Sequence, residues 1–202
     1  SGLCSATILS RYTILTAAHC VSHLKHRNKN FINIQKKRFR IKKIHTLKSF
    51  KPAQKKFLEA AARDDLCINT SLCSEIREEV RLKYVSVTLY DIALINLVDT
   101  LKGSVNIISL DFDPPAPWDP IHMVGHGFVK HSLDKGFYLQ PKVPYIKKGA
   151  LEVLPNGIYA AFGLYPSDYL TAPGDSGGAL LNEQYQQIGI ISGAYTLSLI
   201  HI

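Results

Sequence analysis

Residues 174–180 read Gly-Asp-Ser-Gly-Gly-Ala-Leu, and this stretch says most about the fold and chemistry of the chain. A serine hydroxyl becomes a useful nucleophile only when a base removes its proton, and the oxyanion formed by its attack needs hydrogen-bond donors. Glycines around Ser176 favour a tight turn whose successive backbone N–H groups point the same way, and they let a carbonyl approach closely. The backbone N–H groups of Gly174 and Ser176 are the expected donors.

Two upstream segments offer the partners that such a serine requires. Residues 15–20 read LTAAHC and place His19 at the end of a strand-like run, while Asp91 directly precedes the apolar run 92–94. Taken alone, His19 suits a structural histidine, Asp91 a turn residue, and 174–178 a simple glycine-rich turn. Their joint occurrence in the order His, Asp, Ser favours a catalytic triad, in an order that subtilisins and α/β-hydrolases do not share.

The segments TAAHC, DIAL and GDSGG resemble the three signature segments of the trypsin-like (chymotrypsin-like) serine proteases. The resemblance covers most of the chain and implies a serine endopeptidase that needs no metal or organic cofactor. It implies that Ser176 is the nucleophile, that His19 is the general base and then the general acid, and that Asp91 orients His19 and stabilises its imidazolium. A polypeptide is the implied substrate.

Further residues acquire roles through the same resemblance. Residues 124–127 resemble the family's Gly-Trp-Gly turn, with His in place of Trp, and residues 189–193 resemble the strand that pairs with the bound substrate backbone. Ser192 falls where the family has a serine near the triad acid, and Gly193 follows it in the substrate-binding strand. Asp175 corresponds to the acid of the activation pocket, which pairs with an inserted amino terminus in the family.

The chain departs from the family pattern at both ends. No inserting peptide precedes Cys4, the residues after Ser192 are few, and Ala172 stands where a pocket cysteine is usual. Leu170 falls at the base of the specificity pocket, where members that cleave after Lys or Arg carry Asp. An apolar base gives a cationic side chain no partner, so we expect cleavage after apolar or small residues.

The implied fold is all-β, with two antiparallel six-stranded β-barrels and shortened termini. We expect a first barrel over 1–112 that carries His19 and Asp91, and a second over 121–202 that carries Ser176. The Pro-rich residues 113–120 mark the boundary.

Local patterns agree with a β-protein that holds one partly helical insertion at about 52–83. Residues 6–9 and 12–16 predict a hairpin, and good helix formers fill 54–63 and 74–80. The remaining β-branched and apolar runs predict strands at 31–34, 39–44, 84–89, 92–95, 121–124, 157–162, 178–181 and 188–192.

Four cysteines suit two disulfides in an oxidising compartment, and so a secreted or periplasmic protein. Cys67 and Cys73 are close enough to staple one loop, and Cys4 and Cys20 would close a hairpin-sized loop, at a spacing that matches the family's disulfide beside its histidine. Zinc is the competing interpretation, but the usual CxxC or HxxxH spacing is missing.

The net charge is +8, and residues 21–58 contain thirteen Lys or Arg and no Asp or Glu. A solvated basic face is the plainer interpretation, and an anionic partner is the functional one. Nucleic acid is disfavoured because neither a reading helix nor interleaved aromatic residues accompany the charge. No apolar run reaches the roughly 18–20 residues that span a bilayer, and no signal peptide is visible.

Two other functions stay open beside an active peptidase. A catalytically inactive or zymogen-like protease fold that acts as a binding module is compatible with the altered ends. An unrelated esterase is disfavoured, because its nucleophile normally lies in Gly-x-Ser-x-Gly and its histidine comes last.

Overall fold

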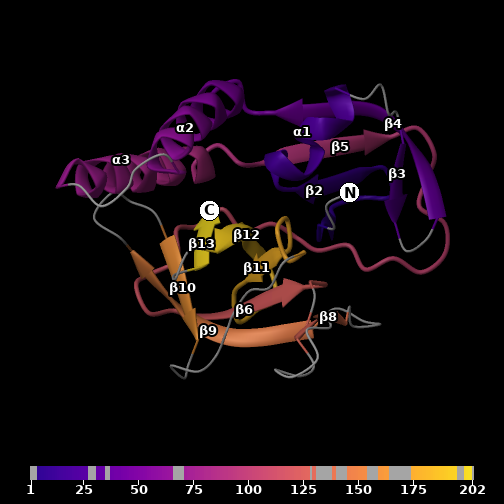
Figure 1. Cartoon of the computed structure of the whole chain (residues 1–202). Helices are drawn as coiled ribbons and strands as arrows, with labels where there is room; N and C mark the ends of the chain where they lie inside the picture. Colours follow the sequence, from indigo (N-terminus) through magenta and orange to yellow (C-terminus); the bar gives the residue numbers. More distant parts are fainter. Residues whose placement is uncertain are drawn as a thin grey trace.

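The computed structural model describes ten stretches of the chain, which form two antiparallel sheet units with a pair of helices at one side (Figure 1). The mostly β architecture expected from the sequence is therefore confirmed. The described residues are 4–26, 31–34, 37–65, 71–127, 129–130, 138–139, 145–153, 159–163, 174–194 and 198–201.

The amino-terminal half forms a five-stranded sheet. Its described strands lie in the order β1-β2-β5-β4-β3, an open arrangement where the sequence predicted six strands in a closed barrel. The predicted hairpin is present, with Thr7 opposite Leu15 and Ile8 opposite Ile14. The strands are β1 (Thr7–Ile8), β2 (Thr13–Thr16), β3 (Phe31–Ile34), β4 (Lys37–Thr46) and β5 (Ala93–Leu97).

The carboxy-terminal half is a closed six-stranded barrel, as predicted, in the order β10-β13-β12-β11-β6-β9. Four of its strands lie on predicted runs, whereas β9 and β13 were not predicted. A separate two-stranded ribbon pairs β7 with β8. The bounds are β6 (Pro120–Gly125), β7 (Val129–Lys130), β8 (Tyr138–Leu139), β9 (Tyr145–Val153), β10 (Tyr159–Gly163), β11 (Ala179–Leu181), β12 (Gln187–Ala194) and β13 (Ser198–His201).

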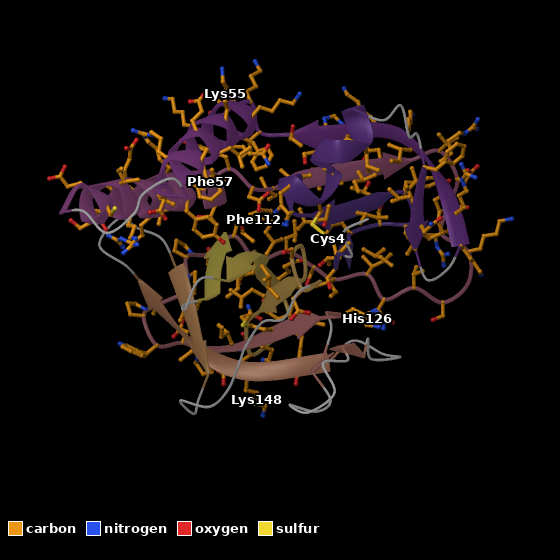
Figure 2. All side chains as sticks on the ribbon, viewed as in Figure 1. Cys4, Lys55, Phe57, Phe112, His126 and Lys148 are labelled. Atoms are coloured by element: carbon orange, nitrogen blue, oxygen red, sulfur yellow. A yellow bond between two sulfur atoms is a disulfide. The ribbon has the colours of Figure 1, made fainter. Side chains whose placement is uncertain are left out.

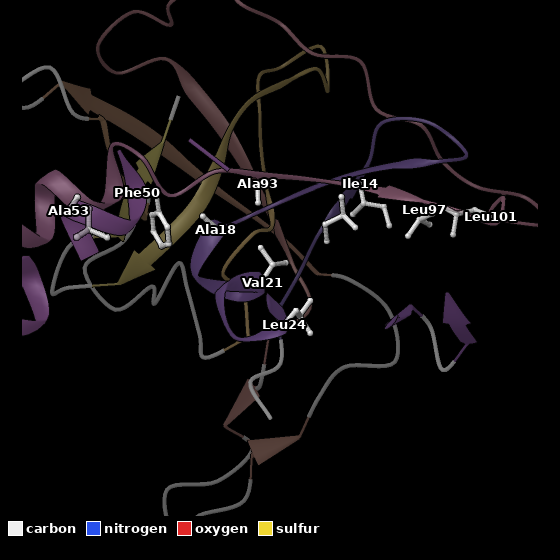
Figure 3. Packing of buried hydrophobic residues seen from close by; sticks show 11 residues of the cluster. Ile14, Ala18, Val21, Leu24, Phe50, Ala53, Ala93, Leu97 and Leu101 are labelled. Carbon is white, nitrogen blue, oxygen red and sulfur yellow. The ribbon is translucent and has the colours of Figure 1, made fainter. Parts of the chain in front are cut away.

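Each half buries its own apolar core. Helix α1 (Ala18–His26) packs Val21 and Leu24 against Ile14 and Leu97 of the first sheet (Figure 3). The barrel encloses a second cluster, which consists of Ile121, Met123, Leu151, Leu180, Ile188 and Ile191.

A third buried cluster joins the two halves. Leu15 of β2 and Ala17 pack against Ile190 of β12, and these three side chains are at most 6% exposed. The end of β2, which leads directly to His19, is therefore held against β12, the barrel strand that carries Ser192.

The predicted insertion is an antiparallel pair of helices, α2 (Phe50–Asp65) and α3 (Ser71–Thr88). Phe50 is 1% exposed and anchors the pair in the first core, and the rings of Phe57 and Tyr84 lie 5.4 Å apart between the helices. A charged hydrogen bond of 2.7 Å joins Arg63 to Glu79 at the surface. The pair is thus tied both to itself and to the sheet.

The strand predicted over 84–89 is wrong, because α3 continues to Thr88. Val80 and Val87 are buried and Tyr84 contacts Phe57, so residues spaced by three or four bury one helical face. That burial overrides the β propensity of the valines and threonine. None of the described helices has the length and apolar character needed to cross a membrane.

The described cysteines are all disulfide-bonded. Cys4 is bonded to Cys20, as predicted, with Cα atoms 6.2 Å apart. Cys73 also takes part in a disulfide, and its predicted partner Cys67 lies outside the described residues.

Candidate active site

Strand pairing brings His19 and Asp91 together. His19 is the second residue of α1, two positions beyond Ala17, and Asp91 lies two residues before β5. Because Thr16 of β2 pairs with Ala93 of β5, the segments that carry both side chains meet at one end of the sheet. His19 Nδ1 lies 2.6 Å from Asp91 Oδ2, and the backbone N–H of His19 donates to Asp91 Oδ1 at 2.8 Å. Both carboxylate oxygens thus hold the histidine.

Asp91 receives a further hydrogen bond from the other half of the molecule. The buried Ser192 hydroxyl on β12 donates to Asp91 Oδ2 at 2.6 Å. Asp91 is only 2% exposed, and a carboxylate is tolerated at such depth when several donors surround it. Ser192 therefore directly contacts Asp91, the acid near which the family resemblance placed it.

The loop that carries Ser176 depends on glycine at defined positions. Gly174 and Gly177 have φ values of 101° and 84°, a region that other residues rarely adopt. At Gly177 a side chain would also collide with Thr16 Oγ1 and the Ser5 carbonyl. The N–H of Gly177 donates to the Ile191 carbonyl at 2.6 Å. Gly177 therefore lets this loop lie directly against the first half.

Ser5 organises this loop, and sequence reasoning did not single it out. Its backbone N–H donates to the Ser176 carbonyl at 2.9 Å, and its hydroxyl donates to the Gly174 carbonyl at 2.9 Å. The same hydroxyl accepts from the backbone N–H of His126 at 2.9 Å, and Thr16 Oγ1 donates to the Ser5 carbonyl at 2.9 Å. The only sequence signal was its position beside Cys4.

The Cys4–Cys20 disulfide, whose Cys4 is labelled in Figure 2, contacts both the histidine and the serine loop. Cys20 Sγ is 3.6 Å from His19 Nε2 and 3.7 Å from the Ser176 carbonyl oxygen. Among the described residues, no hydrogen bond joins the Ser176 hydroxyl to His19. Catalytic hydrogen bonds are often long without substrate, and the His19 side chain is 36% exposed. His19 and Ser176 thus flank the same disulfide at the surface.

Asp175 points inward while Ser176 remains partly exposed. Asp175 is 1% exposed and accepts a hydrogen bond from the backbone N–H of Gly127 at 2.7 Å. Gly125 leaves room for it, because a Cβ there would lie 2.6 Å from Asp175 Cγ. The residues that resemble the Gly-Trp-Gly turn therefore enclose the acid expected in the activation pocket.

The remaining predicted site residues are placed unevenly. Among the described residues, the backbone N–H groups of Gly174 and Ser176 donate to no backbone carbonyl. Gly193 lies on β12 opposite Leu199 of β13, just after an irregularity in the register. Leu170, predicted at the base of the specificity pocket, lies outside the described residues.

One group of side chains has the composition of a metal site. Ligand atoms of Cys4, His19 and Cys20 lie within 4.8 Å of one another. The two sulfur atoms are bonded to each other, so neither can act as a thiolate ligand. This group does not fit a metal in its oxidised state.

Comparisons with known proteins agree with this fold. Human heparin binding protein has a similar structure, with a TM-score of 0.62 and 14% identity over 98% of this chain and 80% of that one. Neuropsin, a serine protease expressed in mouse brain, gives a TM-score of 0.60 at 16% identity, covering 98% of this chain and 82% of its own.

A Glu endopeptidase gives a TM-score of 0.56 at 18% identity, over 98% of this chain and 78% of that chain. No curated protein sequence matches the chain significantly. The sequence model of the family described as Trypsin matches residues 1–199. With nearly its whole length matched and a two-sheet fold shared with these structures, the chain belongs to the trypsin family of serine proteases.

Proposed function

We propose that this protein is a serine endopeptidase that acts through an acyl-enzyme, with His19, Asp91 and Ser176 as its triad. The observation that carries the proposal is the buried Asp91, whose carboxylate holds the ring and the backbone of His19 while Ser192 approaches from the other half. A structural histidine would need only one of these contacts. An arrangement that fixes the imidazole on two sides suits a group that must gain and lose a proton.

In the proposed reaction, Ser176 Oγ attacks the carbonyl carbon of a peptide bond and His19 takes the hydroxyl proton. The N–H groups of Gly174 and Ser176 stabilise the oxyanion, and His19 then gives its proton to the leaving amine. Water hydrolyses the resulting ester in the same way, with His19 again acting as base and then as acid. Asp91 keeps the ring oriented and compensates its positive charge.

The proposed substrate is an extended polypeptide that pairs with the β12 backbone beside Ser192 and Gly193. Leu170 at the pocket base predicts apolar or small side chains at the cleavage position. Peptide libraries test this preference, and cleavage mainly after Lys or Arg would contradict it. Because disulfides persist in oxidising surroundings, the proposed location is outside the cell or in a periplasm.

We also propose an anionic partner for the basic segment 21–58. Its exposed side chains include Lys37, Arg38 and Lys43, and the described residues hold no acidic partner for them. One structural neighbour carries the name heparin binding protein. At 14% identity that likeness concerns the fold, so the charge of this chain is the support for the proposal.

Labelling with a fluorophosphonate probe tests the proposed activity. We expect the purified chain to be labelled, and Ser176→Ala and His19→Ala to lose labelling, because the probe needs an activated serine and oxyanion donors. Ser104→Ala, at an exposed serine, is the matched control and should label as the parent does. A folded parent chain that resists the probe would favour the inactive, zymogen-like binding module instead.

A further inference from the structure

The outer face of β4 carries an unbroken row of basic side chains. The side chains of Arg38, Arg40, Lys42, Lys43 and His45 are exposed, while the residues between them turn inward. At a rise of about 3.3 Å per residue, this row is about 20 Å long. We call it the β4 basic row.

A local irregularity in β4 increases the number of lysines that this row exposes. The pairing of β4 with β5 shifts register between Ile41 and Lys43, so an extra residue is inserted there. As a result Ile41 and Ile44 both pack toward the core, while Lys42 and Lys43 are both exposed. A regular strand would have turned one of these lysines toward the core.

Nothing on the neighbouring strands neutralises the β4 basic row. Strands β3, β4 and β5 contain no Asp or Glu, and no ion pair within the described part of the chain involves a β4 cation. Like charges at this spacing repel one another, so an uncompensated row costs stability unless a polyanion covers it.

The positive surface continues from β4 onto α2. Lys48, Lys51 and Lys55 are exposed, and Lys55 projects from α2 away from the barrel (Figure 2). Lys51 and Lys55 also line a hollow of about 500 Å³, together with Ser22, Gln54, Leu58, Glu59 and Ala62. Glu59 lies 3.8 Å from Lys55 and marks where the basic surface meets acidic residues.

From this surface we infer that the partner is a linear sulfated polysaccharide that lies along the β4 basic row toward α2. This inference rests on the proposed anionic partner and is independent of the proposed peptidase activity. Sulfate groups keep their charge at all ordinary pH values, and the planar guanidinium forks of Arg38 and Arg40 suit such oxyanions.

Other polyanions match the surface less well. Single-stranded nucleic acid needs exposed aromatic faces for stacking, but Phe31 beside the row is covered by Arg38, whose Cζ lies 4.0 Å from the ring centroid. A membrane-binding surface presents apolar side chains to insert between lipids, whereas the exposed positions of the β4 basic row are charged.

Binding to heparin, used as the probe, tests the inference. We expect the triple variant Arg38→Gln/Arg40→Gln/Lys43→Gln to bind heparin about tenfold more weakly than the parent at ~0.15 M salt, because three charge contacts are lost. The matched control is Arg81→Gln/Lys102→Gln/Lys148→Gln, which removes three exposed charges elsewhere and should stay within about twofold of the parent.

Further outcomes would overturn the inference. If both triple variants bound heparin equally weakly, the binding would depend on the net charge of the protein and not on the β4 basic row. Undiminished binding of fully desulfated heparin would remove the requirement for sulfate, and tighter binding of single-stranded DNA of matched charge would favour nucleic acid. Fluorophosphonate labelling of the same samples reports separately on the peptidase proposal, and their thermal midpoints report folding. Loss of labelling with heparin binding intact therefore rejects only the peptidase proposal.

Discussion

At the scale of single residues, the site depends on polar groups that contact one another across the chain. Ser192 and Asp91 are 101 positions apart, yet their side chains lie 2.6 Å apart in a buried environment. The signature segments predict Asp91 and Ser176 as site residues because each lies within a recognisable local sequence pattern. Ser5 had no such signal, since its importance arises only when residues 169 positions away fold against it.

The Ser192 hydroxyl should matter more than a surface hydroxyl. We expect Ser192→Ala to lower the free energy of unfolding by about 1–3 kcal/mol, because a buried carboxylate loses a donor. If the activation free energy of labelling rises by about 1.4 kcal/mol for the same reason, fluorophosphonate labelling slows roughly tenfold. Urea denaturation and labelling rates measure both effects. Unchanged values for both would mean that Ser192 does not support Asp91.

At the scale of elements, local propensity identified most strands but could not identify all. Runs rich in β-branched residues predicted β2 and β5, whereas β9 contains Lys147, Lys148 and Gly149 and lacks that pattern. The prediction for residues 84–89 was wrong in the opposite sense: a strand was expected, but the valines and the threonine continue a helix. Tyr84 packs this helix against Phe57. Pairing across the chain decides such segments.

A comparison of two glycines with similar φ values distinguishes the cost of backbone strain from the cost of a steric clash. Gly177 and Gly103 have φ values of 84° and 88°, but only at Gly177 does a Cβ meet other atoms. We expect Gly103→Ala to cost about 1–2 kcal/mol and Gly177→Ala at least about 3 kcal/mol, with loss of labelling only in the latter. If urea denaturation gave the same loss of unfolding free energy for both variants, the serine loop would not depend on close contact with the first half.

At the scale of the whole molecule, we propose two domains, 1–112 and 121–202, with the catalytic groups at their interface. The end of the first proposed domain is tied to the second, since the Asp111 N–H donates to the Gln187 carbonyl and the Gln187 N–H donates to the Ser109 carbonyl. The prolines of residues 113–120 predict the boundary. The sequence could not indicate that Ile190 would pack on Leu15 and Ala17 across the interface.

Two adjacent isoleucines test whether this interface sets the alignment of the site. Ile190 packs between the halves and Ile191 packs inside the barrel, and both are at most 2% exposed. We expect Ile190→Val and Ile191→Val each to cost about 0.5–1.5 kcal/mol in urea denaturation. Only Ile190→Val should also slow fluorophosphonate labelling. Equal slowing in both variants would mean that packing between the halves has no special part in catalysis.

The contacts of Ser5 also bear on when activity can arise during synthesis. Residues 174–178 leave the ribosome long after Ser5, and contacts between such distant positions close late because the intervening chain must first be ordered. The loop that carries Ser176 therefore stays unsupported until residues 174–178 have been made and have folded against Ser5. In the proposed peptidase, activity would begin only after that contact has formed, long after His19 and Asp91 have left the ribosome.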